Sequence, residues 1–357
     1  MQAYKSRGPN GLNFIDLFCG CGGLSLGFAR AGFKAVAGID HNEPALETYR
    51  KNVGFSANWD LNSDAWVEKI ESTLDGRHLD VLVGGPPCQG FSLTGTRRFD
   101  DARNSLYNSV FHGVEAFQPK AVLIENVRGM ATLYGGQAKR EIERKFEDLG
   151  YDVQTKILDS ANFGVPQHRL RLFFVATKPE FRFKWPEPTH MDGSFISCED
   201  AIGDLPSMEG INQDAANYLF GTSGEYQALM RENSSMAVNH RPTAHKPFVI
   251  ETIRQVPEGG NHKDLPPGVG ESRKFNEAWT RYHSKRPSRT IDTGHRNHFH
   301  YKYDRVPTIR ENARLQSFPD DFVFYGSKTE QNRQVGNAVP VFLAQAIALQ
   351  IDKAIRE

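Results

Sequence analysis

The chain has 357 residues, of which 39% are hydrophobic and 24% charged, and its 43 basic and 43 acidic side chains leave no net charge at neutral pH. A chain of this length can bury a substantial core, which predicts one large and one smaller domain. No apolar run is long enough to span a bilayer, and the N-terminus lacks the apolar core of a signal peptide. The four cysteines have no Cys-x-x-Cys spacing, which is against a disulfide framework or a zinc site. We therefore expect a cytoplasmic protein without a membrane partner.

Residues 12–32 predict a strand, a glycine-rich turn and a helix. The glycines of this turn, Gly20 and Gly22 among them, would let the backbone approach a ligand where the helix begins. The next predicted strand, 34–39, ends in Asp40, whose carboxylate could accept hydrogen bonds from ribose hydroxyls. This pattern predicts a cofactor site with an adenosine-binding end.

The turn departs in two ways from the Gly-x-Gly-x-x-Gly pattern of dinucleotide-binding proteins, and both departures indicate which class of cofactor it could bind. The last position of Gly-x-Gly-x-x-Gly is occupied by Ser25, and the first strand ends in Asp16, which would repel a pyrophosphate. Both favour a cofactor with an adenosine and no phosphates. S-adenosylmethionine is such a cofactor, and Asp16 could face its cationic end.

The following elements alternate between strand and helix. Strands are predicted at 81–83 and 122–124, and helices at 105–117 and 136–149. Such alternation predicts an α/β fold with a doubly wound, mostly parallel sheet, together with a second, smaller and irregular domain.

Residues 79–92 begin as a buried strand and stop at two glycines and two prolines, directly before Cys88. A thiol there lies at the carboxyl end of a central strand, where open α/β sheets bind their ligands. A buried cysteine that acts as a small hydrophobe is the alternative. The polar exit through Gln89 and Gly90 favours a nucleophile.

Glu125 ends the strand that follows that of Cys88, so both are expected at the same sheet edge. It could serve the chemistry or simply pair with an arginine. Further on, the alternation from Gln167 predicts a strand with Gln167, Arg169 and Arg171 on one face. A surface ion-pair ladder is the alternative, but the apolar continuation to Val175 favours a core strand whose polar end meets the site.

Residues 179–305 show no further alternation of predicted strands and helices, and they contain a basic stretch. From Arg231 to Arg310 there are 15 Lys and Arg against 8 Asp and Glu, together with seven of the 12 histidines. Phosphate binding requires a basic patch of this kind, although a solvated surface could show the same excess of basic over acidic residues. His295, His298 and His300 lack cysteine or acidic partners at ligand spacing, so no metal is predicted.

The C-terminal part returns to regular elements. Thr308 and Glu311 have the spacing of a capping box at the start of a helix. Residues 341–351 predict a helix that is apolar nearly all round and therefore buried.

Six motifs in this order resemble those of the cytosine-5 DNA methyltransferases. They are Phe-Ile-Asp-Leu-Phe-Cys-Gly-Cys-Gly-Gly at 14–23, Pro-Pro-Cys-Gln-Gly-Phe-Ser at 86–92, Glu-Asn-Val at 125–127, Gln-x-Arg-x-Arg at 167–171, and the segments 306–320 and 334–340. The resemblance implies a catalytic, S-adenosylmethionine-binding domain from residues 1–178 and 306–357. It implies a target-recognition domain from residues 179–305.

The resemblance also implies roles for single residues. Phe18 would pack on the adenine, Asp40 would bind the ribose and Asp60 would accept from the adenine amino group. For Asp60, a helix N-cap is the alternative. The remaining cofactor residues would be Asp16, Gly20, Gly22, Pro87 and Asn337. The expected DNA contacts, chosen mainly for their positive charge, are Ser92, Arg97, Arg98, Arg273, Lys274, Arg281 and Arg286.

The implied chemistry joins the catalytic residues. The thiolate of Cys88 would add to C6 of a flipped-out cytosine and so make C5 nucleophilic. Glu125, with a pKa expected to be raised by its apolar setting, would hydrogen-bond or protonate N3. Arg171, with Arg169 near it, would hold the exocyclic carbonyl and the thiolate.

The expected substrate is a specific sequence in double-stranded DNA. Methylation of transfer RNA and a catalytically silent DNA-binding regulator of the same fold are the alternatives. The long basic segment favours duplex DNA over a tRNA loop as the substrate. The catalytic residues Cys88, Glu125, Arg169 and Arg171 are all present, which argues against a catalytically silent protein. A monomeric bacterial or phage enzyme is expected, with a restriction endonuclease as its genetic partner.

Overall fold

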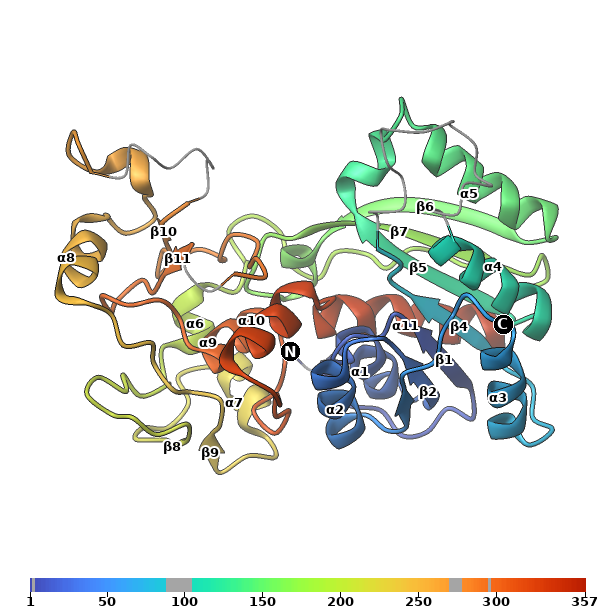
Figure 1. The fold of residues 1–357 in the computed structure, drawn as a ribbon, viewed down its shortest axis with the longest axis horizontal. Coiled ribbons are helices and arrows are strands. Elements are labelled where there is room, and N and C mark those ends of the chain that lie inside the picture. The colour runs from blue at the N-terminus through green and yellow to red at the C-terminus, as the bar shows by residue number, and fades with distance from the viewer. Residues whose placement is uncertain (2–3, 88–104, 270–277, 295–296) are drawn as a thin grey trace. The chain divides into compact units, whose positions relative to one another are not determined.

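The computed structural model describes residues 1, 4–87, 105–269, 278–294 and 297–357 (Figure 1). The chain divides into two compact units. The first, called the sheet unit here, comprises Tyr4–Asp159, Leu170–Glu187 and Leu343–Glu357. The second, called the loop-rich unit, comprises Met1 with Ser160–Arg169 and Pro188–Phe342.

In the described residues, the sheet unit contains a seven-stranded sheet with the order β3-β2-β1-β4-β5-β7-β6 (Figure 1). Only β7 runs antiparallel to its neighbours β5 and β6, and the other pairs are parallel. The predicted doubly wound, mostly parallel sheet is confirmed. The strands are β1 (Asn13–Leu17), β2 (Lys34–Ile39), β3 (Ser56–Ala57), β4 (Val81–Gly84), β5 (Ala121–Val127), β6 (Asp152–Asp159) and β7 (Leu170–Thr177).

Helices cover the sheet because its central strands β1, β4 and β5 are buried and largely apolar on both faces. On one face, buried side chains of β1, β4, β5 and β7 form one core with α3, α4 and α5. Toward the other face, Phe28 of α1 packs on Phe14 of β1, with ring centroids 5.3 Å apart. The helices of this unit are α1 (Gly23–Arg30), α2 (Glu43–Asn52), α3 (Ala65–Leu74), α4 (Ser105–Phe117), α5 (Gln137–Asp148) and most of α11 (Val341–Arg356).

Helix α11 confirms the prediction of a buried C-terminal helix. Leu343, Ile347 and Ile351 are fully buried, and the amide of Gln345 donates to the carbonyl oxygens of Lys5 and Arg30. No single helix in the described part of the chain has the length and apolarity of a membrane span, although the bent pair of α10 and α11 meets these two criteria together.

The loop-rich unit has short elements joined by long irregular segments. Its helix α9 begins with the predicted capping box, in which Thr308 and Glu311 bond to each other's backbone N–H groups. The elements are α6 (Cys198–Ile202), β8 (Ala216–Asn217), α7 (Glu225–Arg231), β9 (Met236–Ala237), α8 (Pro247–Gln255), β10 (Thr280–Arg281), β11 (His298–Phe299), α9 (Ile309–Leu315) and α10 (Lys328–Asn337).

The boundary between the units differs from the expected one at residues 305 and 306. Helices α9 and α10 lie in the loop-rich unit, because α9 packs on α6 and on α10. The chain returns to the sheet unit only at Leu343, inside α11. The sequence predicted that the chain returns to the catalytic domain at Val306. In the structure, the segment that contains α9 and α10 still packs within the loop-rich unit.

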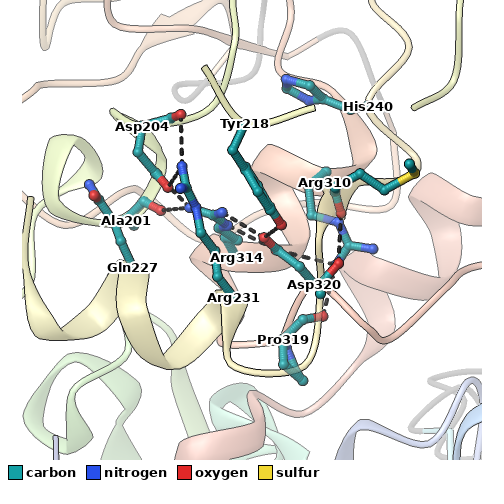
Figure 2. Close-up of polar contacts among 12 residues, drawn as sticks. Ala201, Asp204, Tyr218, Gln227, Arg231, His240, Arg310, Arg314, Pro319 and Asp320 are labelled. Atoms are coloured by element: carbon teal, nitrogen blue, oxygen red, sulfur yellow. Dashed lines mark hydrogen bonds and ion pairs between the residues drawn. The ribbon is translucent and has the colours of Figure 1, made fainter. Parts of the chain in front are cut away.

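A buried ionic network forms part of the core of the loop-rich unit (Figure 2). Arg314 is fully buried and donates to both carboxylate oxygens of Asp320, at 2.9 and 2.6 Å, and to Asp204 at 2.6 Å. Arg231 pairs with the same Asp204, and its guanidinium lies 3.7 Å from the ring centre of Tyr218. Buried charges of this kind are stable only when they are paired and fully hydrogen-bonded.

Candidate active site

The glycine-rich turn after β1 has the backbone conformation that its sequence predicts. Gly20 and Gly22 have φ values of +52° and +97°, and Phe18 also has a positive φ of +62°. The backbone N–H of Gly20 donates to Oδ2 of Asp40 at 2.9 Å, which joins the turn to the end of β2. The residues that were expected to hold an adenosine are thus neighbours within the sheet unit.

Asp16 lies at the base of this turn and is only 1% exposed. Its Oδ2 accepts a hydrogen bond of 2.6 Å from the hydroxyl of Ser25, which also bonds to the hydroxyl of Tyr49 at 2.9 Å. No group among the described residues donates a hydrogen bond to its Oδ1. Burial raises the pKa of Asp16 to about 8, against the opposing hydrogen bond from Ser25.

An unpaired buried carboxyl oxygen indicates a missing donor or cation. The cationic end of S-adenosylmethionine would supply such a group, and there is open space at Gly20, where an added Cβ would meet nothing within 4 Å. The residues of this turn therefore fit the cofactor that the resemblance implies.

Replacing Asp16 by asparagine is expected to stabilise the ligand-free protein. Because the folded-state pKa of Asp16 is raised, its ionisation costs folding free energy, and this cost grows as the pH rises from about 4 to about 8. We expect the stability gain of the variant to be larger by about 3–4 kcal/mol at pH 8 than at pH 5, because each unit of pKa shift corresponds to about 1.4 kcal/mol. Denaturant unfolding of both proteins at the two pH values measures this difference.

The exposed Asp60 offers a control for this prediction, since Asp60→Asn should change stability equally little at both pH values. A stability difference for Asp16→Asn that does not widen with pH would contradict the buried, neutral carboxyl.

Asp60 lies on an exposed turn. Its side chain accepts from the backbone and side-chain N–H groups of Asn62, each at 2.9 Å, and these bonds lower its pKa. The alternative role of a helix N-cap is wrong, because α3 begins at Ala65 after Asp64. The contact with an adenine amino group stays a prediction.

The loop that carries Cys88 leaves the sheet beside Glu125. Strands β4 and β5 are parallel neighbours, so the end of β4 at Gly84 lies next to Ile124 and the following Glu125. A Cβ atom on Gly85 would lie 3.4 Å from Oε2 of Glu125, so the carboxyl group contacts the start of this loop. Pro87 is exposed, and Cys88 itself lies outside the described residues.

Arg171 reaches Glu125 diagonally across β5 and β7. Arg171 is paired with Val127 in the antiparallel register, and Glu125 lies two residues away on the same face. The Nε of Arg171 donates to Oε1 of Glu125 at 2.9 Å, with the two side chains 14% and 13% exposed. The raised pKa that the apolar setting of Glu125 suggests stays a prediction.

Asn126 holds the beginning of the loop that leads to Cys88 through hydrogen bonds. Its Nδ2 donates to the carbonyl oxygen of Pro86 at 2.9 Å and to the hydroxyl of Tyr107 in α4 at 2.6 Å. Both contacts are buried, so the chain two residues before Cys88 has a defined position. Tyr107 was not identified from the sequence, because its helical spacing indicates only a core position.

Gln167 and Arg169 do not share a strand face with Arg171. Strand β7 begins only at Leu170, and both earlier residues belong to the loop-rich unit, where they are almost fully buried. Arg169 donates to the carbonyl oxygens of Ile291 and Gly336, at 3.2 and 2.8 Å. The expected alternating strand from Gln167 is therefore wrong, and Arg169 binds backbone carbonyls.

Gln167 joins the same segments. Its amide nitrogen donates to Gln316 and its oxygen accepts from the backbone N–H of Ile291, while Gln316 donates to the carbonyl of Val335. These bonds connect four parts of the chain, around residues 167, 291, 316 and 335. Gln316 was missed in the sequence, since nothing local distinguishes it from a surface glutamine.

Gly336 allows this close packing, and replacing it by alanine is expected to destabilise the loop-rich unit. An added Cβ would lie 2.2 Å from the carbonyl oxygen of Asp292, and rigid backbone cannot yield as a side chain does. We expect a loss of about 3 kcal/mol in unfolding free energy. Gly221→Ala, at an exposed glycine with open space around it, is the control and should stay within about 0.5 kcal/mol.

Apart from Arg286, the remaining predicted contacts fall into three groups. Asn337 is exposed at the end of α10. Arg281 is buried, donates to the carbonyl oxygen of Ile253 and pairs with Asp304 at 2.8 Å, and its contact with DNA stays a prediction. Ser92, Arg97, Arg98, Arg273 and Lys274 lie outside the described residues.

Arg286 is exposed and lines a groove of about 530 Å³ in the loop-rich unit. The exposed cationic side chains of this basic groove are those of Lys285, Arg286 and Arg289, and the buried Arg281 and the imidazoles of His168 and His283 also line it. Asp192 also lines it, and Lys285 pairs with Glu199. Phe195 packs edge-on against His168, with ring centroids 5.2 Å apart.

A doubly wound sheet with a glycine-rich turn after β1, and with a carboxylate–arginine pair beside the loop after β4, defines an α/β fold of the methyltransferase type. The family model of C-5 cytosine-specific DNA methylases matches residues 12–353. The chain belongs to this family and is a DNA cytosine-5 methyltransferase.

Individual relatives agree with this assignment. The chain is 40% identical to the type II methyltransferase M1.HphI of Haemophilus parahaemolyticus, over 94% of this chain and 86% of the relative. It is 34% identical to M.AgeI of Thalassovita gelatinovora, over 96% and 99%. A crystal structure described as a DNA modification methyltransferase of an E. coli prophage has a TM-score of 0.78 and 26% identity, over 97% of this chain and 100% of that one.

Proposed function

We propose that this DNA cytosine-5 methyltransferase modifies one cytosine within a specific duplex sequence, with S-adenosylmethionine as the methyl donor and Cys88 as the nucleophile. The observation that carries the proposal is the pair of Glu125 and Arg171 beside the loop that leads to Cys88. When bound, S-adenosylmethionine supplies an electrophilic methyl group. Asp16, Phe18, Gly20, Gly22 and Asp40 would hold it, with Asp60, Pro87 and Asn337 as further predicted contacts.

Cys88 would form a bond from its sulfur to C6 of the extruded cytosine, which places electron density on C5. Glu125 would accept or donate a hydrogen bond at N3 and the adjacent amino group, and Arg171 holds that carboxylate in place. After methyl transfer, loss of the C5 proton re-forms the double bond and releases the thiolate. Asn126 would position the Cys88 loop through the Pro86 carbonyl.

Arg169 would act by positioning. Its guanidinium binds two backbone carbonyls of the loop-rich unit, which supports a role in organising that unit. A direct role toward the thiolate, as first expected, stays a prediction.

The substrate assignment is tested by supplying the enzyme with methyl-labelled S-adenosylmethionine and with duplex DNA or tRNA in separate reactions. We expect label in DNA, at C5 of cytosine, and bisulfite sequencing of DNA from an expressing host would give the recognition sequence. Label in tRNA alone would overturn the proposal. The monomeric state and the genetic link to a restriction endonuclease stay predictions.

Replacing Arg286 by alanine is expected to weaken DNA binding without altering its sequence preference. We propose that the basic groove contacts a DNA phosphate, and loss of one such contact should lower the slope of log K against log salt by about 1. Fluorescence anisotropy with a labelled duplex at several salt concentrations measures the slope. Arg333→Ala, at an exposed arginine of the same unit outside the groove, should leave it unchanged.

A further inference from the structure

A second pocket of the loop-rich unit, about 500 Å³ in volume, is lined by residues that have no part in the proposed methyl transfer. It lies between the segment around Arg241 and the first turn of α10. The polar side chains that line it are those of Asp214, Arg241, Thr243, Lys328 and Gln331.

The amine of Lys328 is held in a fixed position in this pocket. Its Nζ donates to the carbonyl oxygen of Arg241 at 3.0 Å and to Oγ1 of Thr243 at 2.8 Å. Among the described residues, no acceptor takes the third N–H. When Lys328 loses a proton, its neutral amine can still donate both of these hydrogen bonds. The lone pair of the nitrogen then points in the direction that the third N–H bond had.

The surroundings of Lys328 favour the neutral amine. Burial, followed by the nearby positive charges of Arg241 and Arg305, lowers its pKa to about 8. Asp214 and Glu311 oppose this effect, but their contributions are smaller. Glu330, the acidic residue in the first turn of α10, is turned back onto Ser327 as part of a capping box. A larger share of the Lys328 side chains is therefore neutral at pH 7 than for a lysine with the ordinary pKa.

Arg241 offers an anion site on the same pocket. Its side chain is exposed and, among the described residues, has no hydrogen-bond or ion-pair partner. A guanidinium in this position can hold a phosphate by two parallel hydrogen bonds. Asp214 repels such an anion, but the two cationic side chains of Arg241 and Lys328 line the same pocket and attract it.

We propose that Lys328 is a modification site that is acylated by acyl phosphates, with Arg241 holding the phosphate of the reagent. The neutral amine nitrogen forms a bond to the acyl carbon, the bond between that carbon and the phosphate oxygen breaks, and phosphate leaves with the electron pair. The nitrogen gives its extra proton to solvent, and the product is an amide without positive charge. No oxidant or reductant takes part.

Acetyl phosphate tests this proposal on the full-length protein, with the acetylated fraction of each lysine followed over time by peptide mass spectrometry. The reference is Lys246, an exposed lysine of the same unit that lies outside the pocket. Lys328 should react at least about tenfold faster than Lys246 at pH 7, because burial and the positive charges of Arg241 and Arg305 favour the neutral amine of Lys328. Equal or slower reaction at Lys328 would overturn the proposal.

The role of Arg241 is tested separately with Arg241→Gln and with two acetyl donors. Losing a cation raises the pKa of Lys328 and slows both reagents, so the informative quantity is the rate with acetyl phosphate divided by the rate with p-nitrophenyl acetate, which has no phosphate. This ratio should fall at least about fivefold in Arg241→Gln and much less in Arg241→Lys. An unchanged ratio would overturn phosphate binding by Arg241. Thermal unfolding of each variant shows whether the fold is kept.

Discussion

Replacing Cys88 by serine is expected to reduce methyl transfer to below about one-thousandth of the wild-type rate. A serine hydroxyl is a far weaker acid than a thiol, so almost no alkoxide would be present to add to C6 at neutral pH. The measurement is incorporation of labelled methyl groups into a duplex that contains the recognition sequence. Glu125 and Arg171 stay paired in this variant, so the loss would report the nucleophile alone.

DNA binding separates this loss from misfolding. Cys88→Ser should bind the recognition duplex about as tightly as the wild type, because the side chains differ by one atom. Cys198→Ala is the matched control, since Cys198 is a free, buried cysteine of the loop-rich unit and should not affect transfer. Turnover at the wild-type rate by Cys88→Ser would remove the proposed nucleophile.

Arg314→Met is expected to cause the largest loss of stability, about 3–5 kcal/mol. Arg314 is fully buried and pairs with Asp320 and Asp204, so its removal leaves two buried carboxylates with fewer partners (Figure 2). Burial raises the pKa of Asp320, but Arg314 and Arg310 more than compensate and hold it below its ordinary value. Methionine fills much of the volume but restores none of this charge.

Denaturant unfolding of both proteins measures the loss, and Arg254→Ala supplies the control. Arg254 is 61% exposed and pairs with Glu251 and Asp304, so its removal should cost less than about 1 kcal/mol. Equal effects of the two substitutions would show that the buried network does not hold the loop-rich unit together.

The sheet unit could be predicted well because its local patterns agree with its packing. Strand β2 and helix α4 have the predicted bounds, since apolar periodicity and flanking glycine or proline residues act locally. The glycine-rich turn followed from the same kind of signal, whereas the hydrogen bond from Gly20 to Asp40 was not predicted. These features depend on neighbours in sequence, which a single chain displays directly.

The loop-rich unit could not be predicted in the same way. The spacing of Gln167, Arg169 and Arg171 suggested one strand face, but Arg169 binds carbonyls at Ile291 and Gly336, more than a hundred residues away. The partners of Arg314 are likewise set by long-range packing. An arginine in a helix has the same local pattern whether it faces solvent or a buried carboxylate.

The most direct test of the central claim is covalent trapping with a recognition duplex that has 5-fluorocytosine at the target position. After addition of a thiolate to C6 and methyl transfer, the fluorine at C5 cannot leave as a proton does, so the bond from sulfur to carbon persists. We predict a denaturation-resistant complex whose proteolysis and mass spectrometry place the nucleotide on Cys88. An adduct on another residue, or full methyl transfer to ordinary DNA without any trapped complex, would contradict the mechanism.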